Sequence, residues 1–166
     1  MKVEDPNALR FILQDDVYLL EADKLNYNSI PIPQPEIETP LVNFNYLGSN
    51  KKNFLILVHY AHQEIIAEEH LSALESVLNR IGHNREDVAI LNTAKNIAEF
   101  ELLNTHFMPK TLLILGQESI PAGMSQPSFN LPEKHGDLIV LYTFSFDAMM
   151  ANTANKKAFW EQMKTL

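Results

Sequence analysis

The sequence predicts an α/β protein built around a short, mostly parallel sheet of four strands. Four apolar segments, at residues 54–60, 87–92, 111–116 and 137–142, have the nearly continuous hydrophobic pattern of strands that are buried on both faces. Segments with the apolar spacing of helices follow the first, second and fourth of these strands. Because strands that alternate with helices form parallel sheets through right-handed crossovers, we expect helices on both faces of the sheet.

The chain before residue 54 is less regular. A short β-prone run at residues 17–20 predicts one strand, which could lie at an edge. Pro31, Pro33 and Pro35 exclude a helix after it. We therefore interpret residues 24–52 as a long connecting segment that either lies over the domain or links to a partner. Its apolar residues favour packing; they are Ile30, Ile32, Ile37, Leu41, Val42, Phe44 and Tyr46.

Three helices are expected in the regular part of the chain. Residues 66–81 repeat apolar side chains at helical spacing, and Gly82 stands where a helix C′ residue belongs. The second helix must end before Pro109. Its apolar face is made of Ile97, Phe100, Leu103 and Phe107. A loop from residue 116 to about Gly136 precedes the last strand, and residues 156–163 form the closing helix.

Length and composition indicate one soluble domain, which we place at residues 11–166 after a tail at residues 1–10. The chain has 166 residues, of which 46% are hydrophobic, and it contains no cysteine. A disulfide framework, a thiolate metal site and a cysteine nucleophile are therefore excluded. The longest apolar run, Phe54–Val58, is far shorter than the ~20 residues of a membrane helix. We expect a cytoplasmic protein that contacts no membrane.

The charge balance disfavours direct binding of nucleic acid. Twenty-one acidic residues against 13 basic ones give a net charge of −8, whereas affinity for nucleic acid comes mostly from neutralising phosphates. The lysine doublets Lys51–Lys52 and Lys156–Lys157 are small, and solvated surface is their ordinary interpretation.

Any ligand site is expected beyond the carboxyl ends of the parallel strands, where open α/β sheets bind ligands. His59, His62 and Gln117 fall there and form one candidate site. The acidic residues that follow, Glu64, Glu68 and Glu69, together with His70, could supply metal ligands. A polar strand exit before an acidic first helical turn explains this cluster better, so we assign no metal and no cofactor. Gly116 stands alone without a phosphate-binding motif, and no serine has the context of a nucleophile. We therefore assign no catalytic residue.

The end of the chain carries a recognisable motif. It consists of Met149, Met150, Asn152, Lys156, Phe159 and Trp160. This pattern resembles the closing motif of the psi subunit of the bacterial DNA polymerase III clamp-loader assembly, although Thr153 stands where the family usually has proline. The segments at residues 11–20, 54–60 and 88–93 are similar to psi segments in the same order.

The resemblance implies a three-layer α/β/α sandwich, because psi proteins are similar in fold to uracil-DNA glycosylases. The glycosylase signature Gly-Gln-Asp-Pro-Tyr-His is absent after the first strand, where this chain has His59-Tyr60-Ala61-His62-Gln63. The later Gly116-Gln117-Glu118 is too short a match. The resemblance therefore implies the fold without base-excision chemistry.

The implied function is bridging. In the psi family the N-terminal segment docks on clamp-loader ATPase subunits, and the domain binds the chi subunit, which contacts single-strand-binding protein. Here Val3, Leu9 and Phe11 would be the apolar anchors of the docking segment. Two alternatives stay open. One is a glycosylase-fold enzyme that acts on a nucleotide or base through His59, His62 and Gln117; the other is a stand-alone α/β protein with an unknown partner.

Overall fold

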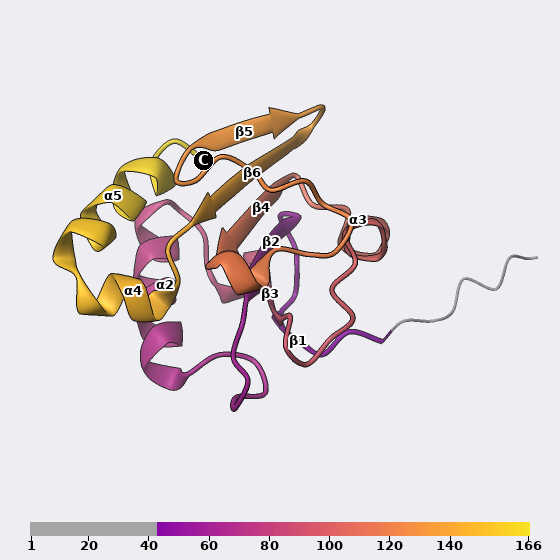
Figure 1. The fold of residues 1–166 in the computed structure, drawn as a ribbon, viewed down its shortest axis with the longest axis horizontal. Helices are drawn as coiled ribbons and strands as arrows, with labels where there is room; N and C mark the ends of the chain where they lie inside the picture. Colours follow the sequence, from indigo (N-terminus) through magenta and orange to yellow (C-terminus); the bar gives the residue numbers. More distant parts are fainter. Residues whose placement is uncertain (1–42) are drawn as a thin grey trace, which may run out of the picture. The chain divides into compact units, whose positions relative to one another are not determined.

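A mixed sheet of six strands organises residues 43–166, the part of the chain that the computed structural model describes (Figure 1). The strands are β1 (Tyr46–Gly48), β2 (Phe54–Val58), β3 (Val88–Asn92), β4 (Thr111–Leu115), β5 (Pro132–His135) and β6 (Leu138–Thr143). Their order in the sheet is β1-β3-β2-β4-β6-β5. The α/β class predicted from the sequence is confirmed.

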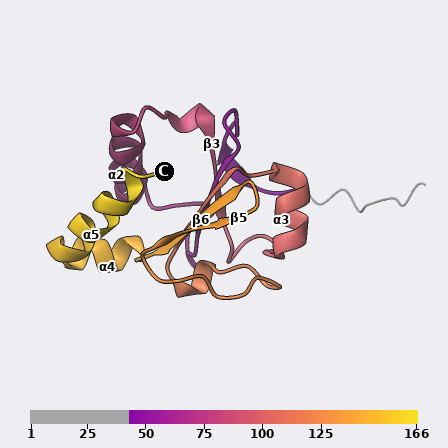
Figure 2. The ribbon, with the colours of Figure 1, turned by 90° about the horizontal axis from the view of Figure 1, so that it is seen from above.

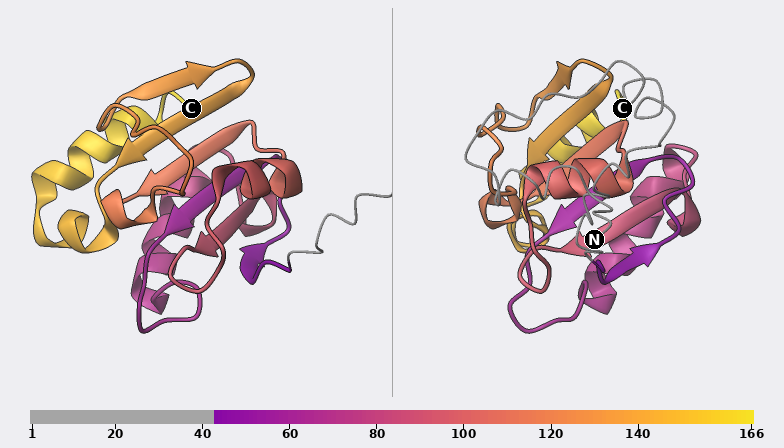
Figure 3. Two further views of the ribbon diagram at one scale, coloured as in Figure 1. Left: turned by 45° about the vertical axis from the view of Figure 1, so that its right-hand side comes forward. Right: turned by 90° about the vertical axis from the view of Figure 1, so that its right-hand side faces the viewer.

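The predicted number of strands is wrong. The four predicted strands form the parallel centre of the sheet, β3-β2-β4-β6, and each edge carries one further antiparallel strand. β1 lies inside the segment that we interpreted as a connection, and β5 lies inside the predicted loop before Gly136. In the left view of Figure 3, the orange β5–β6 pair forms the upper edge. Neither edge strand has the hydrophobic pattern of a buried strand, since β5 reads Pro-Glu-Lys-His.

Within residues 43–166, four α-helices cover the two faces of the sheet. They are α2 (Glu68–Arg80), α3 (Phe100–Phe107), α4 (Phe146–Ala151) and α5 (Thr153–Met163). Figure 2 shows α2, α4 and α5 on one side of the strands and α3 on the other. Two short 3-10 helices, η2 (Arg85–Asp87) and η3 (Gln117–Ser119), lie in the connections. In residues 43–166, no helix combines the length and the apolar character needed to cross a bilayer.

The helices differ from the prediction at several points. α2 is shorter than the predicted 66–81 by two residues at its start and one at its end. α4 was not predicted; it begins after Ser145, whose side chain accepts a hydrogen bond from the Ala148 amide at 3.3 Å. α5 begins at Thr153 rather than at residue 156, because Asn152 caps it. α3 begins at Phe100, so Ile97 precedes the helix and is 57% exposed instead of lying on its apolar face.

Each face of the sheet has its own hydrophobic core. Every residue of β2 and β3 is buried, as the apolar pattern predicts for central strands. The core under α2, α4 and α5 includes Ile56, Leu74, Leu78, Ile90, Leu113, Phe146, Met149, Phe159 and Met163. The core under α3 includes Leu55, Leu57, Leu91, Leu103, Phe107, Leu112, Ile114 and Val140.

The described end of the connecting segment packs on the core under α3. Phe44 is buried and lies 5.3 Å from the ring of Phe107, and Tyr46 meets the same ring edge-on at 5.1 Å. The expectation of packing is therefore confirmed for these two residues. The predicted strand at residues 17–20 and the proline-containing stretch before residue 43 lie outside the described residues.

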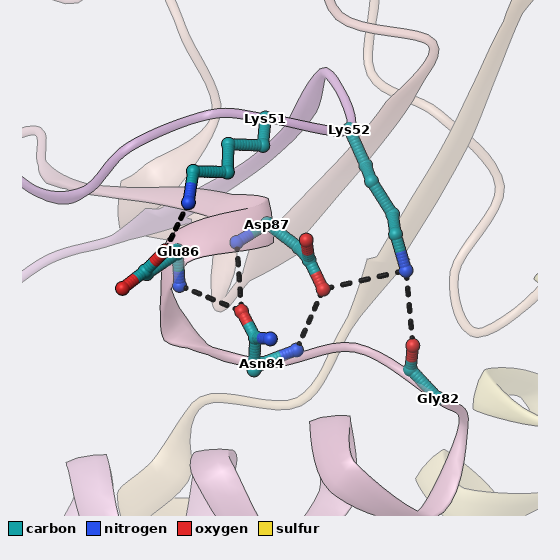
Figure 4. Close-up of polar contacts among 6 residues, drawn as sticks. All are labelled: Lys51, Lys52, Gly82, Asn84, Glu86 and Asp87. Atoms are coloured by element: carbon teal, nitrogen blue, oxygen red, sulfur yellow. Dashed lines mark hydrogen bonds and ion pairs between the residues drawn. The ribbon is translucent and has the colours of Figure 1, made fainter.

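A capping box fixes the entry to β3 (Figure 4). The Asn84 side chain accepts hydrogen bonds from the amides of Glu86 and Asp87, and the Asp87 carboxylate accepts one from the Asn84 amide at 2.9 Å. This backbone hydrogen bond, assisted by Lys52, holds the pKa of Asp87 below its ordinary value although burial opposes the shift. The cluster lies at the amino-terminal end of the strand, opposite the expected ligand edge.

The first lysine doublet belongs to the same cluster. Lys51 forms an ion pair with Glu86, and Lys52 lies 3.3 Å from the Asp87 carboxylate. Lys52 also donates a hydrogen bond to the Gly82 carbonyl at 3.0 Å, as Figure 4 shows. Both side chains thus form ion pairs with neighbouring acids, so this doublet has a structural role in the cluster.

Candidate functional site

The C-terminal motif lines an apolar pocket between α2 and the α4–α5 pair. The pocket has a volume of about 190 Å³. Five of the six motif residues line it, namely Met149, Met150, Lys156, Phe159 and Trp160. The structure therefore gathers at one surface position residues that the sequence analysis linked only by resemblance.

The helix–turn–helix arrangement of α4 and α5 explains how neighbouring residues separate into floor and rim. Met149 is buried against the sheet with 3% of its surface exposed, whereas the next residue, Met150, is 45% exposed. Phe159 on α5 is also buried. Successive helical residues point about 100° apart, so each apolar pair of the motif contributes one side chain to the core and one to the pocket rim.

Asn152 does not line the pocket. It lies between the two helices with extended backbone angles, and its side chain accepts a hydrogen bond from the Ala154 amide at 2.9 Å. Asn155 strengthens the same turn by donating to the Ala148 carbonyl at 3.0 Å. The asparagine of the motif therefore shapes the turn that brings the lining residues together.

α2 supplies the opposite wall of the pocket. Ala73, Val77 and Arg80 line it at positions i, i+4 and i+7, which share one face of a helix. The guanidinium carbon of Arg80 lies 5.7 Å from the ring centroid of Trp160, within the range of a cation–π contact. None of these three residues was singled out from the sequence, because an apolar or basic residue on an amphipathic helix carries no specific signal.

The rim of the pocket is cationic. Arg80 and Lys156 are both exposed, and within residues 43–166 neither has a carboxylate partner at ion-pair distance. Glu161, on the same helix as Lys156, is paired with Lys164 at 2.8 Å. Two cations without an ion-pair partner in the described part of the chain thus border an apolar pocket, although the net charge is −8.

A second cavity lies beyond the carboxyl ends of the parallel strands. It has a volume of about 550 Å³. Its lining consists of His59, Leu115, Gly116, Gln117, Glu118, Ser145 and Asp147. The strand order reverses between β2 and β4, so this is the topological switch point of the sheet. His59 and Gln117 meet there as candidates from the sequence, but His62 does not line the cavity.

Asn92 holds the loop that follows β2. Its side chain is fully buried and accepts a hydrogen bond from the Tyr60 amide at 2.9 Å. It also donates to the carbonyls of Tyr60 and Gln63, each at 2.8 Å. The sequence placed Asn92 only at the end of a strand, and its clamping role depends on contacts about 30 residues away that no local pattern reveals.

His59 is oriented by Thr93. The imidazole Nδ1 lies 3.0 Å from the Thr93 hydroxyl oxygen, and that hydroxyl donates to the Val58 carbonyl at 3.2 Å. The same hydroxyl lies 3.4 Å from the Glu118 carbonyl oxygen. Which group donates in the His59–Thr93 contact depends on the imidazole tautomer, and with either donor the contact orients the ring.

A third group, Tyr60, His70 and Asp147, connects the loop after β2 with α2 and α4. The Tyr60 hydroxyl lies 2.7 Å from His70 Nδ1, and His70 Nε2 is 4.0 Å from the Asp147 carboxylate. The His70 ring stacks on Phe146 at 5.1 Å. Burial, reinforced by the Asp147 charge, raises the pKa of the Tyr60 phenol, so Tyr60 stays protonated and serves as a hydrogen-bonding link rather than as a base.

The loose metal-ligand cluster of the sequence does not assemble in the described part of the chain. Within residues 43–166, no three His, Asp or Glu side chains lie together as a metal would require. His62 and Glu64 are exposed, and His70 is engaged with Tyr60. The proposed docking anchors Val3, Leu9 and Phe11 lie outside the described residues.

Comparison with known proteins does not identify the chain: no family model matches it, and no curated protein matches it significantly.

Proposed function

We propose that this chain is a non-catalytic protein–protein interaction subunit, similar to the psi subunit of bacterial DNA polymerase III. The observation that carries the proposal is the pocket between α2 and α4–α5, where five residues of the psi-like motif lie together. An exposed apolar pocket at the end of a helical layer is a feature of interaction surfaces.

The arrangement of the sheet also supports the proposal. Four central parallel strands with helices on both faces agree with the glycosylase-like three-layer architecture that the resemblance implies. Within that architecture we assign the partners to the clamp loader: its ATPase subunits through residues 1–10, and a chi-like protein through the domain, with single-strand-binding protein contacted indirectly. No cofactor is required by this function.

Affinity capture of the tagged full chain from its native host, followed by mass spectrometry, tests the proposal. We expect clamp-loader subunits or single-strand-binding protein to be retained at moderate salt. Deleting residues 1–10 should release the ATPase subunits but leave a chi-like partner bound. Recovery of unrelated metabolic enzymes, unchanged by the deletion, would refute the replication assignment.

The cavity at the strand ends favours a second candidate, an enzyme of the same fold that acts on a nucleotide or base. His59 lines this cavity beside Gln117 and Glu118, and their imidazole, amide and carboxylate could recognise the edge of a base. Incubating the full chain with uracil-containing single-stranded DNA tests this alternative. Release of the free base by the native chain but not by His59→Ala would support the enzyme.

A further inference from the structure

The pocket between α2 and α4–α5 has the size of one aromatic side chain. Its volume is about 190 Å³, and an apolar protein cavity of about 150 Å³ is known to accept benzene. Its buried floor consists of Phe146, Met149 and Phe159, which are 5%, 3% and 3% exposed. Methionine adapts its shape to different neighbours, so Met149 and the more exposed Met150 suit a site that receives a side chain from outside.

The charges around the pocket specify what should accompany that side chain. Arg80 lies on one wall and Lys156 on the other. Both are exposed, and within residues 43–166 neither has a carboxylate at ion-pair distance. Two unpaired cations that flank an apolar hole are complementary to carboxylates on either side of an apolar anchor.

We propose that this pocket binds an acidic segment of a partner protein, with one large aromatic side chain inserted between Arg80 and Lys156 and neighbouring carboxylates paired with these cations. The inference rests on the proposed function as an interaction subunit, and it specifies the chemistry of the partner segment. Trp160, with Arg80 over its ring, forms the side of the pocket that the incoming side chain meets.

Single-stranded nucleic acid also combines negative charge with flat rings, but the structure favours a peptide. A net charge of −8 opposes a long run of phosphates, whereas two cations are sufficient for a short acidic segment. The lysine doublet that could have extended the basic surface, Lys51–Lys52, is already paired with Glu86 and Asp87.

Selection of random peptides displayed on phage against the full chain tests the proposal without knowledge of the partner. We expect enriched peptides to contain one aromatic residue among several aspartates or glutamates. Trp160 is the only tryptophan of the chain, so its fluorescence reports binding at this pocket when a selected peptide that lacks tryptophan is titrated.

Lys156→Glu and Lys157→Glu are a matched pair of variants for the titration. Both residues are exposed on α5 and both changes alter the charge equally, but only Lys156 lines the pocket. A like charge placed against an acidic ligand costs more than 1.4 kcal/mol, so Lys156→Glu should weaken binding at least about tenfold. Lys157→Glu should change it by less than roughly threefold, the effect of an exposed charge.

Three results would overturn the inference. They are selected peptides without acidic residues, an equal loss of peptide affinity in both lysine variants, and displacement of the bound peptide by oligothymidine at a lower concentration than the free peptide itself requires. Capture experiments separate this failure from that of the proposed function. If clamp-loader partners are retained equally by Lys156→Glu and the native chain, the function stands and the pocket is not the site. If peptides bind the pocket but no clamp-loader protein is captured, the pocket inference stands and the replication assignment fails.

Discussion

Replacing Asn92 by alanine should destabilise the domain more than any other single amide truncation at the carboxyl edge of the sheet. The side chain is fully buried and bridges the end of β3 to the loop after β2. Alanine removes both the donor and the acceptor and leaves the Tyr60 amide and carbonyl without their partners.

The expected loss is about 3 kcal/mol of unfolding free energy. Four hydrogen bonds of 3.1 Å or less disappear: two to the backbone of Tyr60, one to the Gln63 carbonyl and one from the Ala94 amide. Each contributes roughly 0.5–1 kcal/mol net. The Gln63 carbonyl belongs to an exposed loop residue, so in the variant it can bond to water, which lowers the loss of stability. The Tyr60 amide and carbonyl belong to a half-buried residue and hydrate less readily, which raises the loss again.

Urea unfolding followed by circular dichroism measures the loss. With a slope of about 2 kcal/mol per molar urea, the midpoint should fall by roughly 1.5 M. Asn96→Ala is the control: its amide makes three hydrogen bonds, at 2.8, 2.9 and 3.1 Å, but two of them hold Asn45 at an exposed edge. We expect that control to lose less than about 1 kcal/mol. Equal losses in the two variants would show that burial does not set the magnitude and would refute the reasoning.

Three further variants test other parts of the structure. Gly116→Ala should lose about 1–3 kcal/mol in urea unfolding, because φ is +92° and the added Cβ would lie 3.0 Å from Ser145 Cβ; an unchanged midpoint would contradict the close approach. Tyr60→Phe should cost about 1 kcal/mol through the lost hydrogen bond to His70, and in spectrophotometric titration it should remove a tyrosine that ionises above the ordinary range of the phenol; loss of a tyrosine that titrates in the ordinary range would contradict the raised pKa. Asp87→Asn should be less stable than the native chain at neutral pH, and the gap should close as pH falls below about 4 through the depressed pKa of Asp87; a gap that widens on acidification would reverse the sign of that shift.

The centre of the fold was predictable because burial on both faces leaves an unbroken apolar pattern. β2 and β3 have that pattern and were found within two residues of their observed ends. β1 and β5 were missed since an edge strand forms through backbone pairing and needs no apolar side chains. α4 did have a local signal, Ser145 as cap with Asp147 in the first turn, but its six residues are too few to show helical periodicity.

The two cavities differ in how much of their lining could be predicted from the sequence. The reason is how far apart in the sequence their lining residues lie. Met149 to Trp160 span two adjoining helices, so one wall of the apolar pocket is encoded locally and is visible as a motif. Arg80 closes the opposite wall from 80 residues away, as an ordinary basic residue at a helix end. At the strand ends the contacts that join one strand to the next are of this second kind, because parallel strands are connected through crossovers. His59 was therefore predictable as a polar strand exit, whereas its orientation by Thr93 followed only from the register of β2 against β3. The motif itself supplies one cation of the pocket rim, Lys156, whereas the second, Arg80, comes from the helix that packs against the motif and carries no local signal.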